Sequence, residues 1–376
     1  MMNNTACRLV GADFPLFAFS HCRDVVAAVS RAGGFGVFGA SGFTPEALEL
    51  ELRWIDEHVN GRPYGIDILI PEHMPTGRGT TLEALSAMVP HQQREFAAGL
   101  LNQHGIPADA ANFLPQQLPK VLPEIGEALM DVAFRHPIRL IANALGIAPP
   151  SMIERAREHG VPVAALVGAK EHAVRQVQAG VDLIVAQGSE AGGHCGEVST
   201  LVLVPEVIRA VRATGSQVPV LAAGGIMTGA QMAGCMAMGA AGAWTGSVWL
   251  TTVQSEVTPF MRGKLVAASS RDTVRSRART GKHARQLRTP WHEAWEGKGS
   301  PGCLPMPLML SISQPAFQLI ERAAERGEPG GRELASYFVG QGIGLVESVQ
   351  SAETVVYDFM SEFADAFEAL KAQMED

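Results

Sequence analysis

Cysteine is scarce in this chain of 376 residues, and the few cysteines it has are irregularly placed. The five cysteines stand at positions 7, 22, 195, 235 and 303. An odd number without regular spacing argues against both a disulfide framework and a structural zinc site. His21–Cys22 and His194–Cys195 are adjacent pairs without an acidic cluster. Adjacent residues seldom bind one ion together, so we expect no metal site.

Charged residues and long apolar runs are also lacking. Only 18% of the residues are charged and the net charge is −8, which argues against non-specific binding of nucleic acid. No run approaches the roughly 18 uninterrupted apolar residues of a membrane-spanning helix, and the first residues lack the apolar segment of a secretory signal. These absences predict a cytoplasmic protein without nucleic-acid or membrane partners.

Short apolar runs alternate with amphipathic segments along most of the chain. Hydrophobic residues make up 47% of the sequence, enough for a large core. The expected strands are 14–19, 35–38, 64–70, 138–142, 162–166 and 181–186, with two more inside 218–226 and 239–250. Eight strands with helices between them predict an α/β fold, the (β/α)₈ TIM barrel.

Two parts of the chain exceed what a barrel of about 250 residues needs. Residues 71–136 are too long for an ordinary connection after strand three and contain two helix-like segments, 82–104 and 114–135. This helical insertion suits a lid or an oligomer contact, and the sequence leaves both open. We therefore expect a barrel domain over 1–270 that includes the insertion. A C-terminal helical extension over 271–376 would pack on it, with helices near 314–326, 331–347 and 353–374.

The loop after the sixth expected strand is rich in glycine. Val181–Ala186 is followed by Gln187, by glycines at 188, 192, 193 and 196, and by His194. Such backbone suits close approach to a flat or anionic group, and a histidine held there is a candidate for chemistry. The alternative is a plain turn in which the histidine only bonds a loop carbonyl.

The next two expected strands also end in glycine-containing loops. One ends in Gly224-Gly225 and the other in Gly246-Ser247, with a helix expected over 228–238 between them. In TIM barrels the loops after strands seven and eight commonly hold a phosphate group. The three loops together therefore predict a phosphate-bearing ligand at this part of the barrel.

These segments resemble one family. Ala186-Gln-Gly-Ser-Glu-Ala-Gly-Gly-His194-x-Gly196, Pro219-Val-Leu-Ala-Ala-Gly-Gly-Ile226 and Gly239-Ala-Ala-Gly-Ala-Trp-Thr-Gly-Ser247 are similar to the nitronate monooxygenases, which are FMN-dependent barrels. Arg275-Ser-Arg-x-x-Thr-Gly281-Lys-x-Ala-Arg285 and Tyr337-Phe-Val-Gly-Gln341 look like its C-terminal pattern. The superfamily also includes NADH:quinone reductases and flavin-dependent enoyl-thioester reductases.

The resemblance implies an FMN site, residue by residue. Backbone amides of Gly224, Gly225, Trp244, Thr245, Gly246 and Ser247, with the Ser247 hydroxyl, would bind the phosphate. Gln187, Gly192 and Gly193 would lie along the flavin. Ala18, Phe19 and Ser20 would lie under it, where the family's Pro-Met motif is missing. Asp67 stands where many members have Asn, so it is either protonated beside the ring or turned away from it.

The resemblance also implies a catalytic role for His194, near the flavin N5. It would take a proton from a carbon acid or, as a cation, hold an anionic nitronate. The first hypothesis is oxidation of alkyl nitronates by O₂ to carbonyl compounds and nitrite. The second is an NAD(P)H-dependent reductase of quinones or an acyl thioester, and the third a phosphate-binding barrel without flavin. The expected partners are a small-molecule substrate, O₂ and, in the second case, NAD(P)H; homo-oligomerisation is left open.

Overall fold

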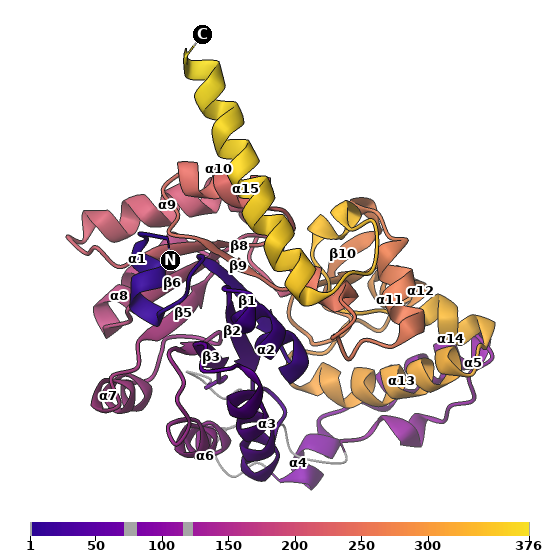
Figure 1. Ribbon diagram of the computed structural model, residues 1–376. Helices are drawn as coiled ribbons and strands as arrows, with labels where there is room; N and C mark the ends of the chain where they lie inside the picture. Colours follow the sequence, from indigo (N-terminus) through magenta and orange to yellow (C-terminus); the bar gives the residue numbers. More distant parts are fainter. Residues whose placement is uncertain (1, 71–80, 116–122, 376) are drawn as a thin grey trace.

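A closed barrel of parallel strands forms the centre of the molecule (Figure 1). The computed structural model describes residues 2–70, 81–115 and 123–375. In their order around the barrel, the strands are β1 (Leu16–Ser20), β2 (Phe35–Gly39), β3 (Tyr64–Asp67), β4 (Ile141–Asn143), β5 (Val163–Val167), β6 (Leu183–Gln187), β8 (Val220–Ala223) and β9 (Ala243–Thr245). β9 pairs with β1, which closes the ring. The predicted TIM barrel is confirmed.

Helices surround this barrel, and the last of them comes from the far end of the chain. The helices between successive strands are α2 (Arg23–Arg31), α3 (Pro45–His58), α6 (Pro123–Ala133), α7 (Pro150–Glu158), α8 (Lys170–Ala179), α9 (Thr200–Ala213) and α10 (Gly229–Ala237). The eighth position belongs to α15 (Ala352–Glu375), which packs between α10 and α2. The short helix α1 (Thr5–Val10) contributes Ala6 and Val10 to the core that fills the barrel.

Alternate residues of each strand face the inside and the outside of the barrel. Phe17, Phe35 and Val37 belong to the apolar cluster inside the ring. Leu16 and Ala18 belong instead to the larger cluster between the strands and the surrounding helices. This alternation shows which residues at the strand ends point into the mouth of the barrel.

A second hydrophobic core lies beside the barrel and is built from two distant parts of the chain. Phe113, from the insertion after β3, packs in this core with Trp291, Trp295 and Ile312. The elements that contribute to it are α4 (Leu82–Ala87), α5 (His91–Gln103), η1 (Ala110–Phe113), α11 (Pro259–Val266), β11 (Ala284–Leu287), α12 (Pro290–Glu296), α13 (Leu308–Glu325) and α14 (Pro329–Leu334). The strand β10 (Thr273–Ser276) pairs with β11. The insertion therefore packs against the chain's own C-terminal part, since α5 and η1 both contact α13.

The C-terminal part differs from its prediction in two respects. The expected helix 331–347 is wrong, because α14 ends at Leu334 and the chain then runs extended to the turn η4 (Gln341–Leu345). The hairpin β10–β11 was not predicted at all. A Cβ at Gly340 would lie 2.6 Å from the Glu190 carbonyl oxygen, so the chain runs extended against the loop after β6 before η4 begins.

The other expected helices are confirmed with changed bounds. The helix expected over 314–326 lies within α13, and that over 353–374 is α15. The segment 82–104 is interrupted before Pro90. Part of the segment 114–135 lies outside the described residues, and α6 occupies its end.

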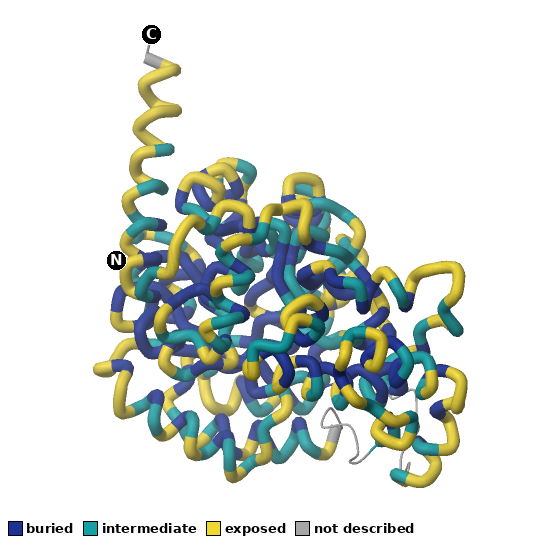
Figure 2. Tube along the Cα trace, turned by 90° about the vertical axis from the view of Figure 1, so that its right-hand side faces the viewer, coloured by how far each residue is buried: buried dark blue, intermediate teal, exposed yellow. Residues whose placement is uncertain are grey.

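The C-terminal end of α15 extends away from the body of the molecule (Figures 1 and 2). Phe367, Leu370 and Met374 are exposed there. In the described part of the chain, no helix combines the length and the apolar character that crossing a membrane requires.

Candidate active site

Four of the predicted site residues have side chains on the inner side of the barrel at its mouth. By the alternation of the strands, Phe19, Asp67, Gln187 and Trp244 point inward at the carboxyl ends of β1, β3, β6 and β9. The Trp244 ring stacks on Phe19 with centroids 6.4 Å apart. No hydrogen bond to the Gln187 amide occurs within the described part of the chain. Gln187 and Asp67 therefore bring polar side chains to an otherwise apolar mouth.

Ala18, Ser20 and Thr245 lie in the same strands, but their side chains have other roles. Ala18 is packed in the outer core. The Ser20 hydroxyl accepts the Cys22 N–H at 3.1 Å, and the Thr245 hydroxyl donates to the Phe17 carbonyl at 3.0 Å. At Ala18 and Thr245 only the backbone is available to a ligand, whereas the Ser20 hydroxyl still has its proton to donate.

The loops after β8 and β9 present free backbone donors. Gly224 and Gly225 adopt positive φ angles of 105° and 72°, which favour glycine. Within the described residues, the N–H groups of Gly225 and Gly246 form no hydrogen bond. The Ser247 hydroxyl accepts the Gly340 N–H at 2.8 Å, which leaves its proton free to be donated. Such a cradle of donors fits a phosphate group.

The glycine-rich loop after β6 is held in place from several sides. The Glu190 carboxylate accepts the N–H and hydroxyl of Thr200 at 2.9 and 3.0 Å. The Arg285 Nε donates to the Ser189 carbonyl at 2.8 Å. A Cβ at Gly192 would lie 2.8 Å from the backbone N of Gly340. Position 192 therefore requires glycine because the C-terminal segment packs against it, and the sequence pattern alone did not reveal this.

His194 lies in β7 (Gly193–His194), a short strand of this loop that is outside the barrel. β7 pairs with β11, so His194 stands opposite Ala284, while Gly193 has a positive φ of 74° and open space around it. The imidazole Nε2 lies 2.9 Å from the Thr280 hydroxyl oxygen. The hairpin β10–β11 thus fixes the position of the histidine.

The partners of Thr280 indicate which nitrogen of His194 carries the proton. The Thr280 hydroxyl donates to the Lys282 carbonyl at 2.9 Å. Its one proton is used there, so it accepts the N–H of His194 Nε2, and Nδ1 is left as the basic nitrogen. This tautomer is inferred from the hydrogen-bond network. The imidazole partner is a hydroxyl, not the loop carbonyl of the alternative interpretation.

The surroundings of His194 favour its neutral form. The residue is exposed as a whole, yet surrounding protein partly shields its imidazole from water. This partial burial lowers the pKa of the imidazole, and the charge of Lys282 lowers it further. At neutral pH the ring is therefore a proton acceptor rather than a cation.

Asp67 is buried at the mouth without a partner for one of its oxygens. It is 3% exposed, and its Oδ1 has no hydrogen bond within the described residues. Burial raises the pKa of this carboxyl to about 7. A buried polar atom without a partner is rare and points to a ligand at this place. Of the two alternatives from the sequence, a carboxyl that is buried at the mouth and partly protonated near neutral pH fits this geometry.

The sequence analysis gave no role to His21, which also lies at the mouth. Its Nδ1 is 2.8 Å from the Gly39 carbonyl oxygen, and its ring contacts Phe19 with centroids 5.2 Å apart. Thr280 and Gly340 were missed as well, although both belong to the C-terminal segments that resembled the family. The unusual Ala18-Phe-Ser-His-Cys22 sequence was the signal that could have found His21.

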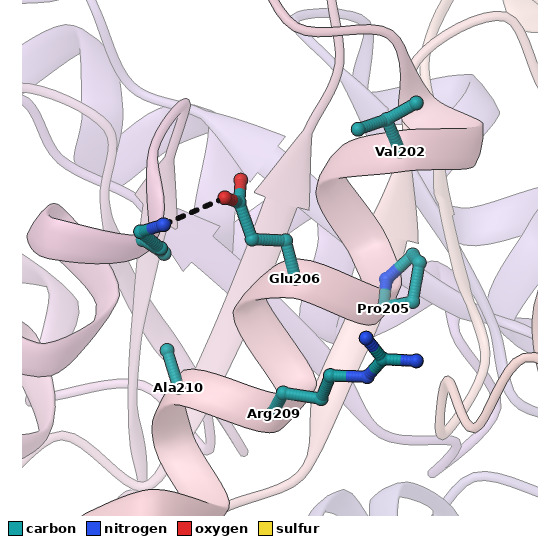
Figure 3. Close-up of a pocket in the computed structure, with 6 residues that line it drawn as sticks. Val202, Pro205, Glu206, Arg209 and Ala210 are labelled. Carbon is teal, nitrogen blue, oxygen red and sulfur yellow. Dashed lines mark hydrogen bonds and ion pairs between the residues drawn. The ribbon is translucent and has the colours of Figure 1, made fainter.

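Lys170, the first residue of α8, is engaged by another helix. Its ammonium pairs with Glu206 at 2.8 Å across a groove between α8 and α9 on the outside of the barrel (Figure 3). The groove is also lined by Val202, Pro205 and Arg209. The described residues contain no group of three or more His, Cys, Asp and Glu side chains that could hold a metal.

The residues of the mouth fit an FMN. The free N–H groups of Gly225 and Gly246 and the Ser247 hydroxyl would hold its phosphate. The unpartnered Asp67 oxygen and the uncommitted Gln187 amide would meet polar atoms of the ring system. His194 would then stand above the same ligand, with Nδ1 as its free nitrogen.

Known proteins are similar to this chain over most of its length. The family model of nitronate monooxygenases matches residues 19–362. A protein of Mycobacterium tuberculosis that is named as a candidate monooxygenase is 51% identical over 371 residues, with 97% of each chain covered.

Two solved structures are similar to the whole chain. Nitroalkane oxidase from Streptomyces ansochromogenes superposes with a TM-score of 0.77 and 25% identity, covering 97% of this chain and 99% of that one. FabK from Thermotoga maritima gives a TM-score of 0.72 and 25% identity, covering 99% and 100%. Because the family model spans most of the chain and the mycobacterial relative matches nearly all of it, this protein belongs to the nitronate monooxygenase family and is an FMN-dependent oxidoreductase.

Proposed function

We propose that this protein oxidises alkyl nitronates with O₂ to carbonyl compounds and nitrite. The observation that carries the proposal is His194, a neutral imidazole on the loop after β6 whose Nε2 hydrogen-bonds with Thr280 and whose Nδ1 is left as the basic nitrogen. The likeness to a structure named nitroalkane oxidase agrees with a nitro compound as substrate. The substrate is then a small carbon acid, and O₂ is the second reactant.

An FMN held at the mouth would supply the redox chemistry that links the substrate to oxygen. The chain supplies binding, orientation and proton transfer. Gly224, Gly225, Trp244, Thr245, Gly246 and Ser247 hold the phosphate end through their backbone and the Ser247 hydroxyl. Gln187, Gly192 and Gly193 line the ring, as do Ala18, Phe19 and Ser20. His194 Nδ1 accepts the proton of a nitroalkane, which converts it to the nitronate.

Asp67 contributes by being partly uncharged near neutral pH. A carboxylate beside the flavin would repel negative charge that arises on reduction, whereas a protonated carboxyl donates a hydrogen bond instead. Burial without a cationic partner produces this state, since it raises the pKa of the group to about 7.

Oxygen consumption tests the proposal directly. The purified protein with its flavin should consume O₂ and release nitrite when propionate 3-nitronate is added without NADH. No O₂ uptake with any alkyl nitronate, under conditions where the flavin is bound, would contradict it.

The second candidate function is an NAD(P)H-dependent reduction of a quinone or an acyl thioester. The likeness to FabK over the full length of both chains favours it as the alternative. Anaerobic stopped-flow mixing separates the two, because rapid bleaching of the flavin by NADH or NADPH, and not by nitronates, selects the reductase.

A further inference from the structure

The last helix carries an apolar stripe that runs beyond the body of the molecule. Met360 and Phe363 of α15 pack against the core outside the barrel strands. Phe367, Leu370 and Met374 continue the alternating spacing of three and four residues, so they lie on the same face of the helix. They are 59%, 51% and 87% exposed, because this end of α15 projects from the body (Figures 1 and 2). A packing seam inside the molecule thus continues into solvent.

The carboxylates of the projecting end stand away from this stripe. With Phe367 and Leu370 at the a and d positions of a heptad, Asp365 and Glu368 fall at the outward f and b positions. The e and g positions, which flank the stripe, hold Ala364, Ala366, Lys371 and Gln373. A second copy of the same helix would therefore meet no carboxylate beside the stripe between residues 364 and 374. The two outward carboxylates, in turn, disfavour an anionic lipid surface as the occupant.

The neighbouring helix α10 offers an uncharged surface next to this end of α15. The N–H of Gly229, the first residue of α10, donates to the Glu362 carboxylate at 2.7 Å. The exposed side of α10 consists of Ala230, Gln231, Gly234 and Ala237. No charged residue occurs between Arg212 and Glu256 in the sequence. Surface helices usually carry charges on their solvent side, and small side chains let another helix approach closely, so this side of α10 suits a helix contact.

The two surfaces together suit a twofold contact between copies of the chain. They adjoin, because the hydrogen bond between Gly229 and Glu362 lies at the base of the projecting end. Two antiparallel copies of α15 would bring the stripes together and place each helix end on the partner's α10, and such an isologous contact closes on itself. Specific interfaces bury about 800 Å² per partner, more than three side chains provide, so the contact requires α10 as well.

We propose that the projecting end of α15 forms the dimer contact of this protein. The stripe of Phe367, Leu370 and Met374 packs antiparallel against the same stripe of a second copy, and the helix end packs on the exposed side of the partner's α10. The proposal is independent of the reaction, because none of these residues belongs to the barrel mouth.

Sedimentation velocity of the flavin-loaded protein over a range of concentrations tests the proposal. We expect the wild type to form a dimer. Leu370→Glu places a charge in the stripe and should raise the dimer Kd by about 100-fold. Ala372→Glu is the matched control, because it adds the same charge to the same exposed helix at the outward f position, and it should leave the Kd unchanged. Flavin absorbance and far-ultraviolet circular dichroism show whether both variants are folded.

Gly234→Glu tests the contribution of α10. A Cβ at this position meets no atom of another described segment within 4 Å, so the substitution fits the single chain and obstructs only a second copy. We expect the dimer Kd to rise about tenfold, and an unchanged Kd would overturn the contact with α10.

Three results would overturn the dimer contact itself. They are a wild type that stays monomeric at high micromolar concentration, a dimer that Leu370→Glu leaves intact, and equal losses in Leu370→Glu and Ala372→Glu. Cosedimentation of a monomeric wild type with phosphatidylglycerol vesicles would instead assign the stripe to a lipid surface, and would overturn the proposal as well.

Discussion

The two halves of the barrel mouth offer different kinds of groups. Between β6 and β9 the mouth consists largely of backbone, with free amides at Gly225 and Gly246. Between β1 and β3 it consists of side chains, namely Phe19, His21 and Asp67. Backbone amides bind a phosphate whatever the surrounding side chains are, whereas side chains can be exchanged to suit a substrate. The first half therefore matches its family closely, and the second half departs from it.

The two halves also differ in what supports them. The loop of His194 is bound by Arg285 and by the segment around Gly340, both of which belong to the part built on the second core. The β1 side is held mainly by the barrel itself, through the Gly39 carbonyl. The position of the reacting histidine therefore depends on the second core, and that of His21 does not.

The largest effect should come from His194→Asn, which removes the basic nitrogen and keeps a side chain of similar polarity. With a neutral nitroalkane as substrate, whose proton must be removed, we expect kcat to fall by about 10²–10⁴-fold, the usual contribution of a general base, with flavin content unchanged. Rapid-reaction measurement of flavin reduction checks this, with His172→Asn, at an exposed histidine of α8, as control. Unchanged turnover would show that His194, and with it the loop after β6, takes no part in the reaction.

Asp67→Asn should change stability in a way that depends on pH. The folded protein holds the Asp67 proton more tightly than the unfolded chain, with a pKa of about 7 against 3.8, so wild-type stability falls as the pH rises between these values. Asparagine does not ionise, so the variant avoids the free-energy cost of a buried carboxylate. The variant should be more stable by on the order of a few kcal/mol at about pH 8, and the difference should disappear near about pH 4. Denaturant unfolding of the flavin-free protein measures it, and a difference independent of pH would show that Asp67 is not the cause.

Gly225→Ala should weaken FMN binding by distorting the cradle. The residue has a φ of 72°, and the added Cβ would lie 3.0 Å from the Glu190 Cβ. The strain of about 1–2 kcal/mol corresponds to a rise of about tenfold in the Kd for FMN. Gly215→Ala is a matched control, because its φ is 81° and a Cβ there meets no neighbour within 4 Å. If both variants bind FMN equally well, the backbone half of the mouth does not hold the cofactor.

The smallest effect is expected for Thr280→Val, which removes the hydroxyl that binds His194 Nε2. Losing this hydrogen bond should lower kcat/KM by about two- to tenfold and shift its dependence on pH. Thr280→Ser retains the hydroxyl and should behave like the wild type. A pH profile that is identical in Thr280→Val would show that Thr280 only packs and does not orient the imidazole.

The barrel and the backbone-lined half of its mouth could be predicted because their sequence patterns lie within short segments. Each strand is a short apolar run, and its closing glycines follow within a few residues, as at Gly224-Gly225. The inward or outward direction of side chains was harder. Ala18 and Ser20 were expected beside the ligand together with Phe19, yet only Phe19 points inward, which depends on the register of β1 in the closed ring.

The sequence alone determined the order of strands and helices, the family and the cofactor. These follow from apolar periodicity and glycine motifs, and each such pattern lies within a single segment. What only the tertiary structure decided is the joining of distant segments. These are the second core of the insertion with α13, the use of α15 as the eighth barrel helix, and the pairing of β7 with β11 that orients His194. Such contacts produce no periodic pattern in the sequence, because they bury surfaces that become neighbours only after the barrel has closed.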